Sequence, residues 1–136
     1  MSDTTAAVGL PLAGRLILIV EDEMIVAFDL SDIVERLGGT SITVGRVGKA
    51  VRLAAAQAFD AAILDLNLAG EPVYPVAIEL RRRGIPFIIA SGYGMEGIAA
   101  DFQDVPILAK PYSHEDVESA LLRALALKHG NALAIA

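Results

Sequence analysis

Short runs of apolar residues alternate along this chain with longer segments in which apolar and polar positions recur at helical spacing. Residues Thr40–Val44 alternate apolar with polar, as expected for a strand at the edge of a sheet. Four other runs are continuously apolar, a pattern typical of strands covered on both faces: residues 15–20, 61–64, 87–90 and 105–109. The pattern therefore predicts five strands.

The segments between these strands have the periodicity of amphipathic helices. The first has an apolar face from Val26 to Leu37 and ends at two glycines. Further helices are expected at residues 50–59 and 76–83. The last helix begins at Ser113, because Asp116 three positions later completes a capping box.

The connection between the fourth and fifth strands is unlike the others. Gly92, Gly94 and Gly97 lie at its start, and each glycine costs about 1 kcal/mol of helix propensity. We therefore expect its helix to be short or mobile.

Five strand–helix units in succession predict one α/β domain with a doubly wound (βα)5 sheet and helices on both faces. The expected domain covers residues 15–128, preceded by a flexible leader at 1–14 and followed by a tail at 129–136. Ligands of such sheets bind at the carboxyl ends of the strands, where the strand order reverses.

The composition of the chain argues against several classes of function. The chain has 11 Lys and Arg against 17 Asp and Glu, a net charge of -6, which disfavours direct nucleic-acid binding. The absence of cysteine excludes disulfides and thiolate metal sites. No apolar run approaches the roughly 20 residues that span a bilayer, and the first residues lack the features of a signal peptide. We expect a cytoplasmic protein that is not bound to a membrane.

Polar side chains follow the apolar strands at the predicted carboxyl edge. Glu21 and Asp22 follow the first strand, Asp65 the third, Ser91 the fourth and Lys110 the fifth. Clustered carboxylates repel one another unless a cation compensates them. The residues therefore predict a cation site, and Mg²⁺ is the cation that such a site favours.

Asp22 and Asp65 supply the two protein carboxylates that a Mg²⁺ ion commonly takes. The backbone carbonyl of Asn67 is a third candidate ligand, and Glu21 is expected to act through a water molecule. A carboxylate held in line with a phosphodonor can itself be the nucleophile, since phosphoryl transfer needs chiefly positioning and charge neutralisation. Lys110 would neutralise charge there.

Four motifs, each following a predicted strand, together resemble those of response-regulator receiver domains: Val20-Glu21-Asp22-Glu23, Leu64-Asp65-Leu66-Asn67-Leu68, Ala90-Ser91-Gly92 and Lys110-Pro111-Tyr112. The resemblance implies that Asp65 is the phosphoacceptor. It also implies that Glu21 and Asp22 serve Mg²⁺, that Ser91 is the switch hydroxyl and that Lys110 contacts the phosphoryl group.

The resemblance further implies a flavodoxin-like sheet of strand order 2-1-3-4-5 and a Lys110–Pro111 bond that is often cis. A histidine kinase or phosphotransfer protein would be the phosphodonor. An effector protein would bind the surface of the fourth helix, fifth strand and fifth helix. The chain would catalyse only its own aspartyl phosphorylation and dephosphorylation, as a stand-alone receiver in a phosphorelay.

Two positions depart from the common receiver pattern. Ile107 stands three residues before Lys110, where an aromatic switch residue is usual. The stretch Ser91-Gly92-Tyr93-Gly94 partly resembles a receiver subgroup with Phe-Ala-Thr-Gly-x-Tyr, so Tyr93 is a switch candidate, with packing over the sheet an equal alternative. A phosphorylation-independent adaptor of the same fold therefore remains the alternative function.

Other conspicuous residues have structural explanations. We expect no phosphotransfer role for His114 or His129, and a packing role for Tyr112. Arginines 81–83 are expected to stabilise a helix terminus rather than to bind a partner. A small phosphotransferase or phosphatase that works through an aspartyl-phosphate lacks support because no second Asp lies two residues after Asp65. A nucleotide-binding flavodoxin-like protein lacks support because no glycine-rich nucleotide motif occurs.

Overall fold

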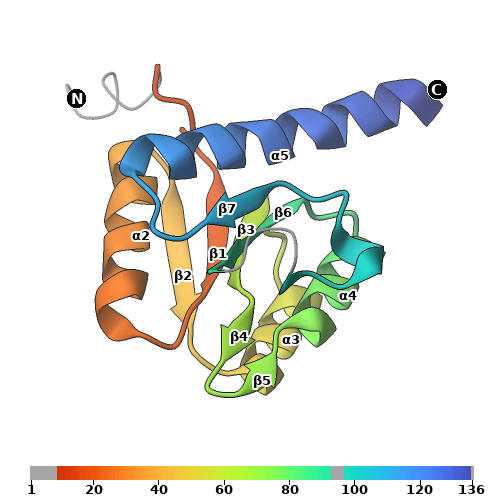
Figure 1. Cartoon of the computed structure of the whole chain (residues 1–136). Coiled ribbons are helices and arrows are strands. Elements are labelled where there is room, and N and C mark those ends of the chain that lie inside the picture. Colours follow the sequence, from red (N-terminus) through yellow and green to blue (C-terminus); the bar gives the residue numbers. More distant parts are fainter. Residues whose placement is uncertain (1–8, 93–96, 136) are drawn as a thin grey trace.

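The computed structural model describes residues 9–92 and 97–135, and its centre is a five-stranded parallel sheet (Figure 1). Its strands are β1 (Leu16–Val20), β2 (Thr40–Val44), β3 (Ala61–Asp65), β6 (Phe87–Ser91) and β7 (Ile107–Ala109). They lie in the order β2-β1-β3-β6-β7, which is the expected order 2-1-3-4-5. The expected edge strand, Thr40–Val44, is confirmed with its bounds unchanged.

Helices cover both faces of the sheet (Figure 1). α2 (Met24–Arg36) and α5 (His114–Ile135) pack on one face. α3 (Val47–Ala56) and α4 (Tyr74–Arg82) pack on the other. This arrangement confirms the doubly wound α/β class.

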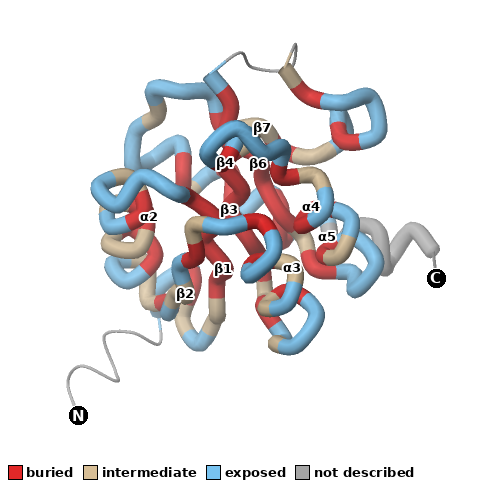
Figure 2. Tube along the Cα trace, turned by 90° about the horizontal axis from the view of Figure 1, so that it is seen from below, coloured by how far each residue is buried: buried red, intermediate tan, exposed pale blue. Residues whose placement is uncertain are grey.

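Alternate residues of each central strand enter two separate apolar cores. Leu18 and Leu64 belong to the core under α3 and α4, whereas Ile17 and Ile63 belong to the core under α2 and α5. Every residue of β3 and β6 is buried, so the tube in Figure 2 is red along these strands. Burial on both faces explains why these strands are continuously apolar in sequence.

A small antiparallel hairpin directly follows β3 and was not predicted. It pairs β4 (Asn67–Leu68) with β5 (Glu71–Pro72). Its two turn residues, Ala69 and Gly70, have φ values of 49° and 88°, as in the type I′ turns that match the twist of a hairpin. Two-residue strands are too short to show a periodicity, which is why the sequence pattern did not reveal them.

The connection between β6 and β7 contains, in its described part, the short 3-10 helix η2 (Ala100–Phe102). The expectation of a short helical element here is confirmed, and its bounds lie later in the chain than the glycines. Tyr93 and Gly94 lie outside the described residues.

α5 begins at the expected capping box but ends later than expected. The Ser113 N–H donates to Asp116 Oδ2 over 2.9 Å, and the Asp116 N–H donates to Ser113 Oγ over 3.1 Å. The helix continues to Ile135, through the segment expected as a tail. The strong helix propensity of alanine and leucine near this end offsets the single Gly130. In the described part of the chain, no helix is both long and apolar enough to cross a membrane.

Candidate functional site

The carboxyl ends of the strands bring the predicted polar residues to one rim of the sheet. Glu21 and Asp22 directly follow β1, Asp65 and Ser91 end β3 and β6, and Lys110 follows β7. The pairing of β3 with β6 brings Asp65 beside Ser91, because Asp65 lies opposite Ala90, the residue before Ser91. The Lys110 N–H in turn donates to the Ser91 carbonyl over 3.0 Å. Parallel pairing therefore assembles the site from residues up to 89 positions apart in sequence.

Three carboxylates form a compact cluster at this rim. One oxygen each from Glu21, Asp22 and Asp65 lies within 4.8 Å of the others. Glu21 is 5% and Asp65 8% exposed, while Asp22 is exposed. Oxygen-only donors at the edge of solvent suit a hard divalent cation that keeps several water ligands. The donor set fits Mg²⁺, as predicted.

The surroundings of Glu21 favour its neutral form. Burial is the largest cause that raises the pKa of Glu21, the negative charges of Asp65 and Asp22 add to it, and the pKa reaches about 7. The Glu23 N–H, which donates to Glu21 Oε2 over 3.0 Å, opposes this rise. A cation at the cluster would favour the charged form.

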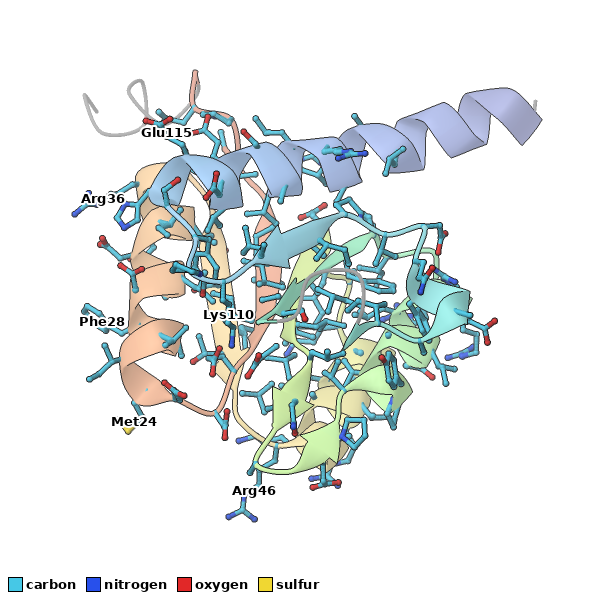
Figure 3. The ribbon with its side chains drawn as sticks, viewed as in Figure 1. Met24, Phe28, Arg36, Arg46, Lys110 and Glu115 are labelled. Atoms are coloured by element: carbon cyan, nitrogen blue, oxygen red, sulfur yellow. The ribbon has the colours of Figure 1, made fainter. Side chains whose placement is uncertain are left out.

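Lys110 provides the positive charge of the site. Its Nζ lies 2.8 Å from Asp65 Oδ1, and its side chain points into the rim (Figure 3). Burial lowers the pKa of Lys110, but the hydrogen bond and charge of Asp65 outweigh burial, so the net shift is upward. The ammonium group thus stays charged beside Asp65. The following peptide bond, Lys110–Pro111, is cis.

The hairpin after Asp65 leaves the backbone of Asn67 available. Val73 N–H donates to the Leu66 carbonyl over 3.0 Å, so Asn67 and its partner Pro72 form the next, non-hydrogen-bonded pair of the ladder. Pro72 also has no N–H with which to bind the Asn67 carbonyl. This geometry is compatible with the predicted carbonyl ligand, whose role stays a prediction.

The expected switch hydroxyl, Ser91, and the residue at the usual aromatic switch position, Ile107, both lie in the sheet. Ser91 is buried at the end of β6, beside the carboxylate cluster. Ile107 is half-buried and packs against the apolar core under α3 and α4. Tyr93, the candidate for the missing aromatic residue, lies outside the described residues, so its role stays a prediction.

Tyr112 and His114 lie where a structural role was expected. Tyr112 packs against the core under α2 and α5. Burial, together with the negative charge of Glu21, raises its pKa to about 12. His114 is exposed and its Nε2 lies 3.3 Å from Asp29 Oδ1 on α2. His129 lies in α5, where the structure describes only the backbone.

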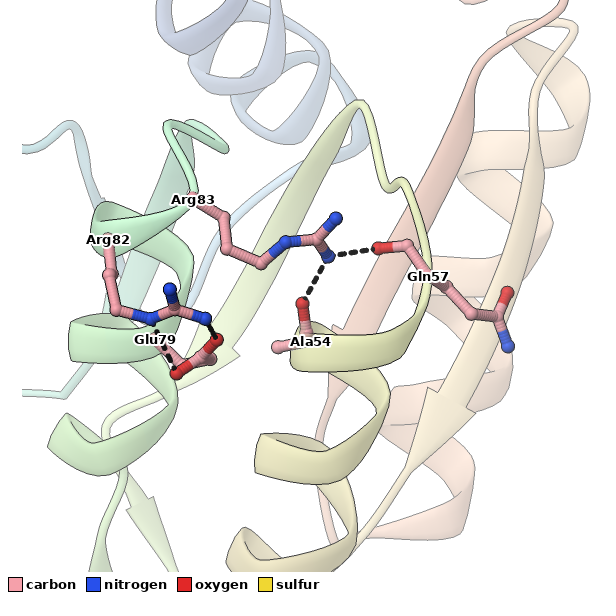
Figure 4. A network of polar contacts seen from close by, with 5 residues as sticks. All are labelled: Ala54, Gln57, Glu79, Arg82 and Arg83. Carbon is pink, nitrogen blue, oxygen red and sulfur yellow. Dashed lines mark hydrogen bonds and ion pairs between the residues drawn. The ribbon is translucent and has the colours of Figure 1, made fainter.

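The three arginines at the end of α4 all have partners within the protein, and Figure 4 shows those of Arg82 and Arg83. Arg83 Nη1 donates to the carbonyls of Ala54 and Gln57 at the end of α3, over 2.6 Å each. Arg82 pairs with Glu79 one turn earlier on α4. Arg81 reaches the connection that contains η2. These contacts support the structural explanation of the arginine run.

An exposed apolar patch beside the site was not predicted. Met24, Ile25 and Phe28, in the first turns of α2, are 86%, 86% and 76% exposed. Figure 3 shows Met24 and Phe28 directed away from the sheet. The sequence did contain a sign of it, because these three apolar residues fall outside the apolar face that runs from Val26 to Leu37.

Comparison with known proteins bears on the family of the chain. No protein-family model matches the chain, and no curated protein matches it. Among solved structures, SdrG from Sphingomonas melonis Fr1 is 42% identical over 82% of this chain and 96% of its own, with a TM-score of 0.73. The response regulator PhyR from Brucella abortus shares the fold at 21% identity over 99% of this chain and 57% of its own, with a TM-score of 0.78.

A third structure contains the ion that the acidic cluster fits. The receiver domain of the sensor histidine kinase PA1611 from Pseudomonas aeruginosa PAO1 has a magnesium ion coordinated in its active-site cleft. It is 26% identical over 84% of this chain and 99% of its own, with a TM-score of 0.69. With the sheet order, the acidic cluster and the 42% identity to SdrG, these similarities show that the chain belongs to the receiver-domain family of response regulators.

Proposed function

We propose that this protein is a receiver of a two-component phosphorelay that takes a phosphoryl group from a histidine kinase or phosphotransfer protein onto Asp65. The observation that carries the proposal is the joint placement of Asp65, its two acidic neighbours and the Lys110 ammonium 2.8 Å away. Nucleophile, cation ligands and countercharge thus lie at one solvent-accessible rim. The similar receiver domain with bound magnesium supports Mg²⁺ as the cofactor.

The proposed reaction is a single displacement at phosphorus. An Asp65 carboxylate oxygen attacks the phosphorus of phosphohistidine, the new O–P bond forms as the N–P bond breaks, and the leaving imidazole nitrogen takes up a proton. Mg²⁺, held by Asp22, Asp65 and the Asn67 carbonyl, would supply positive charge to the phosphoryl oxygens.

The remaining groups of the rim stabilise the product. Lys110 exchanges its contact with the Asp65 carboxylate for the more negative phosphoryl group, and the Ser91 hydroxyl hydrogen-bonds a phosphoryl oxygen. With a cation bound, Glu21 would hold a water molecule beside it. The chain acts on its own Asp65 alone in this proposal, so it is not an enzyme toward other substrates.

We propose that the output surface is the expected one of the fourth helix, fifth strand and fifth helix, of which the last two are β7 and α5. A groove of about 390 Å³ lies between them, lined by Pro106 and Ile107 from the sheet edge and by Asp116, Ala120 and Arg123 from α5. A change at Lys110, which directly follows β7, is well placed to alter this groove. An effector protein that binds there would detect phosphorylation of Asp65. The cytoplasmic location and the lack of direct nucleic-acid binding stay predictions.

A phosphorylation-independent adaptor remains the second candidate. It is favoured by Ile107 at the position of the usual aromatic switch and by a described β6–β7 connection that contains only short helical structure.

Intact-protein mass spectrometry distinguishes the receiver proposal from the adaptor proposal. After incubation with acetyl phosphate and Mg²⁺, the receiver proposal expects the wild-type chain to gain one phosphoryl group, and expects no gain in the Asp65→Asn variant or with a chelator. A gain retained in Asp65→Asn would contradict the assignment of Asp65. No gain in the wild type from acetyl phosphate or from any purified phosphorylated kinase would favour the adaptor.

A further inference from the structure

We infer that the exposed face of α3 is an interaction surface for an acidic segment of another protein. Three exposed cationic residues follow one another along it at intervals of three: Arg46 at the N-cap position, Lys49 and Arg52. Residues three apart are neighbours on a helix surface, so these charges form a continuous basic stripe. Figure 3 shows Arg46 directed away from the rest of the molecule. α3 contains no acidic residue, although the whole chain has a net charge of -6.

The basic stripe has no partner within the described part of the chain. Elsewhere in that part, ion pairs or hydrogen bonds engage the cationic side chains of Arg15, Arg36, Arg81, Arg82, Arg83 and Lys110. No described residue forms such a contact with the side chain of Arg46, Lys49 or Arg52. The charge of the stripe is therefore available to a molecule from outside.

The basic stripe also opposes the stability of its own helix. The N-terminal end of a helix has a partial positive charge, so cations there are unfavourable. α3 nevertheless begins with Arg46 and Lys49, has no acidic residue in its first turn and has no side chain that caps its N-terminus. Carboxylates supplied by a partner would offset this repulsion. Local rules of helix stability are broken most often where a residue serves function, so binding explains the stripe better than folding does.

Gly48 gives a partner chain close access to α3. It is exposed in the first turn, next to Lys49 and four positions before Arg52. Glycine has a lower helix propensity than alanine, and a Cβ here would meet no atom of the described chain within 4 Å, so packing does not require it. The exposed residues Ala55 and Ala56 are also small. A partner backbone can therefore lie close to this face, between cationic side chains.

The distribution of charge favours a short acidic segment over a larger anionic surface. Charges are screened beyond about 8 Å at physiological ionic strength, so a segment along α3 interacts chiefly with the basic stripe. A nucleic-acid duplex or an anionic membrane would also face the acidic remainder of the chain. Helices that bind membranes bury large apolar side chains, and in the described chain the exposed side chains of that kind lie outside α3.

The basic stripe is separate from the proposed output groove. α3 follows β2, at the edge of the sheet opposite β7. It packs with α4 on one face of the sheet, whereas α5 covers the other face. A partner on the stripe thus leaves the groove between β7 and α5 open. The inference goes beyond the proposed function and does not depend on phosphorylation of Asp65.

The test uses a model acidic segment and matched charge variants. The probe is a fluorescein-labelled peptide of alanine and glutamate with glutamate at every third or fourth position, and its control peptide has glutamine in place of glutamate. Lys49→Gln with Arg52→Gln removes two charges from the stripe. The control variant, Arg36→Gln with Arg82→Gln, changes the net charge equally at exposed residues that pair within their own helices.

Fluorescence anisotropy should show that the wild type binds the glutamate peptide, and that added salt weakens this binding. The stripe variant should lose about tenfold in affinity, since each lost ion pair weakens binding severalfold. The control variant should bind as the wild type does. No binding of the glutamate peptide, equal binding of the glutamine peptide, or an equal loss in both variants would overturn the inference.

Gly48→Gln tests whether a partner chain lies against the helix. The change should raise the melting temperature, because glutamine has a higher helix propensity and the site has room for a side chain. The same variant should nevertheless lose severalfold in affinity for the glutamate peptide, because the new side chain holds the peptide away from α3. A higher melting temperature with unchanged affinity would overturn the inferred close approach.

Other occupants give distinct results. Vesicles of phosphatidylserine and phosphatidylcholine that bind the wild type but not the stripe variant, without binding of the peptide, would assign the stripe to a membrane and overturn the inference. A concentration-dependent dimer in light scattering that the stripe variant dissociates would assign it to a second copy of the chain and would likewise overturn it.

Discussion

At the scale of single residues, Glu21 combines deep burial with a titratable group. Its 5% exposure and the nearby carboxylates of Asp65 and Asp22 favour the protonated form, and its pKa rises from 4.5 to about 7. The unfolded chain has no such environment. Folding of the metal-free protein therefore depends on the protonation of Glu21.

This environment predicts that the metal-free protein loses stability as the pH rises from about 4.5 to about 7, by at most about 3 kcal/mol. In this window the unfolded Glu21 is ionised while the folded one keeps its proton, so the unfolded state binds fewer protons. Urea unfolding in a chelator, across this pH range, measures the effect. Glu21→Gln should flatten the pH dependence, and an identical dependence in both proteins would contradict the prediction.

At the scale of elements, Arg81 joins α4 to the β6–β7 connection. Its Nη1 donates to the Asp101 carbonyl over 2.8 Å and its Nη2 lies 3.0 Å from Asp104 Oδ1. The guanidinium also lies 4.8 Å from the centre of the Phe102 ring, which stacks on Tyr74 at 5.2 Å. Side-chain contacts thus hold η2, whose length is too short for stability by propensity alone.

We therefore expect Arg81→Met to destabilise the protein by about 1–2 kcal/mol and to speed amide hydrogen exchange around η2. The matched control is Arg82→Met, because Arg82 pairs with Glu79 within α4 and should change exchange at η2 little. Hydrogen exchange followed by mass spectrometry reports both. Equal exchange at η2 in the two variants would show that Arg81 does not hold this element.

At the scale of the whole molecule, the sheet concentrates negative charge at one rim. The carboxyl ends of β1 and β3 place Glu21, Asp22 and Asp65 within 4.8 Å, and Lys110 after β7 is the nearby countercharge. Their mutual repulsion is a cost of the folded state, since the unfolded chain holds these groups apart. Cation binding to the folded state should relieve it.

Mg²⁺ should accordingly raise the melting temperature, with a stabilisation of about 2.7 kcal/mol at a concentration about 100 times its Kd. Asp22→Asn should remove most of this increase, because it deletes one of the clustered carboxylates. Glu115→Gln, an exposed acidic residue on α5 outside the cluster, is the control and should keep it. A similar Mg²⁺ effect in both variants would contradict a site at the rim.

The five strands of the sheet and the members of the site could be predicted from local pattern. Strands buried on both faces must be continuously apolar, and parallel strands bring the residues that follow them to one edge. The same two properties identify Asp65, Lys110 and the acidic pair as neighbours from the sequence alone. The pairing of Lys110 with Asp65, 45 positions apart, then follows from the sheet register.

Other features depended on contacts between distant segments. The hairpin after Asp65 is too short to have a period, and the partners of Arg81 come from a connection 20 or more residues later. The exposure of Met24, Ile25 and Phe28 depends on which face of α2 meets the sheet. Local sequence encodes periodicity and propensity, and so it determined the five strands of the sheet and the long helices between them, in chain order. Packing between elements decided which side chains meet and which surface stays open, because that depends on the whole fold.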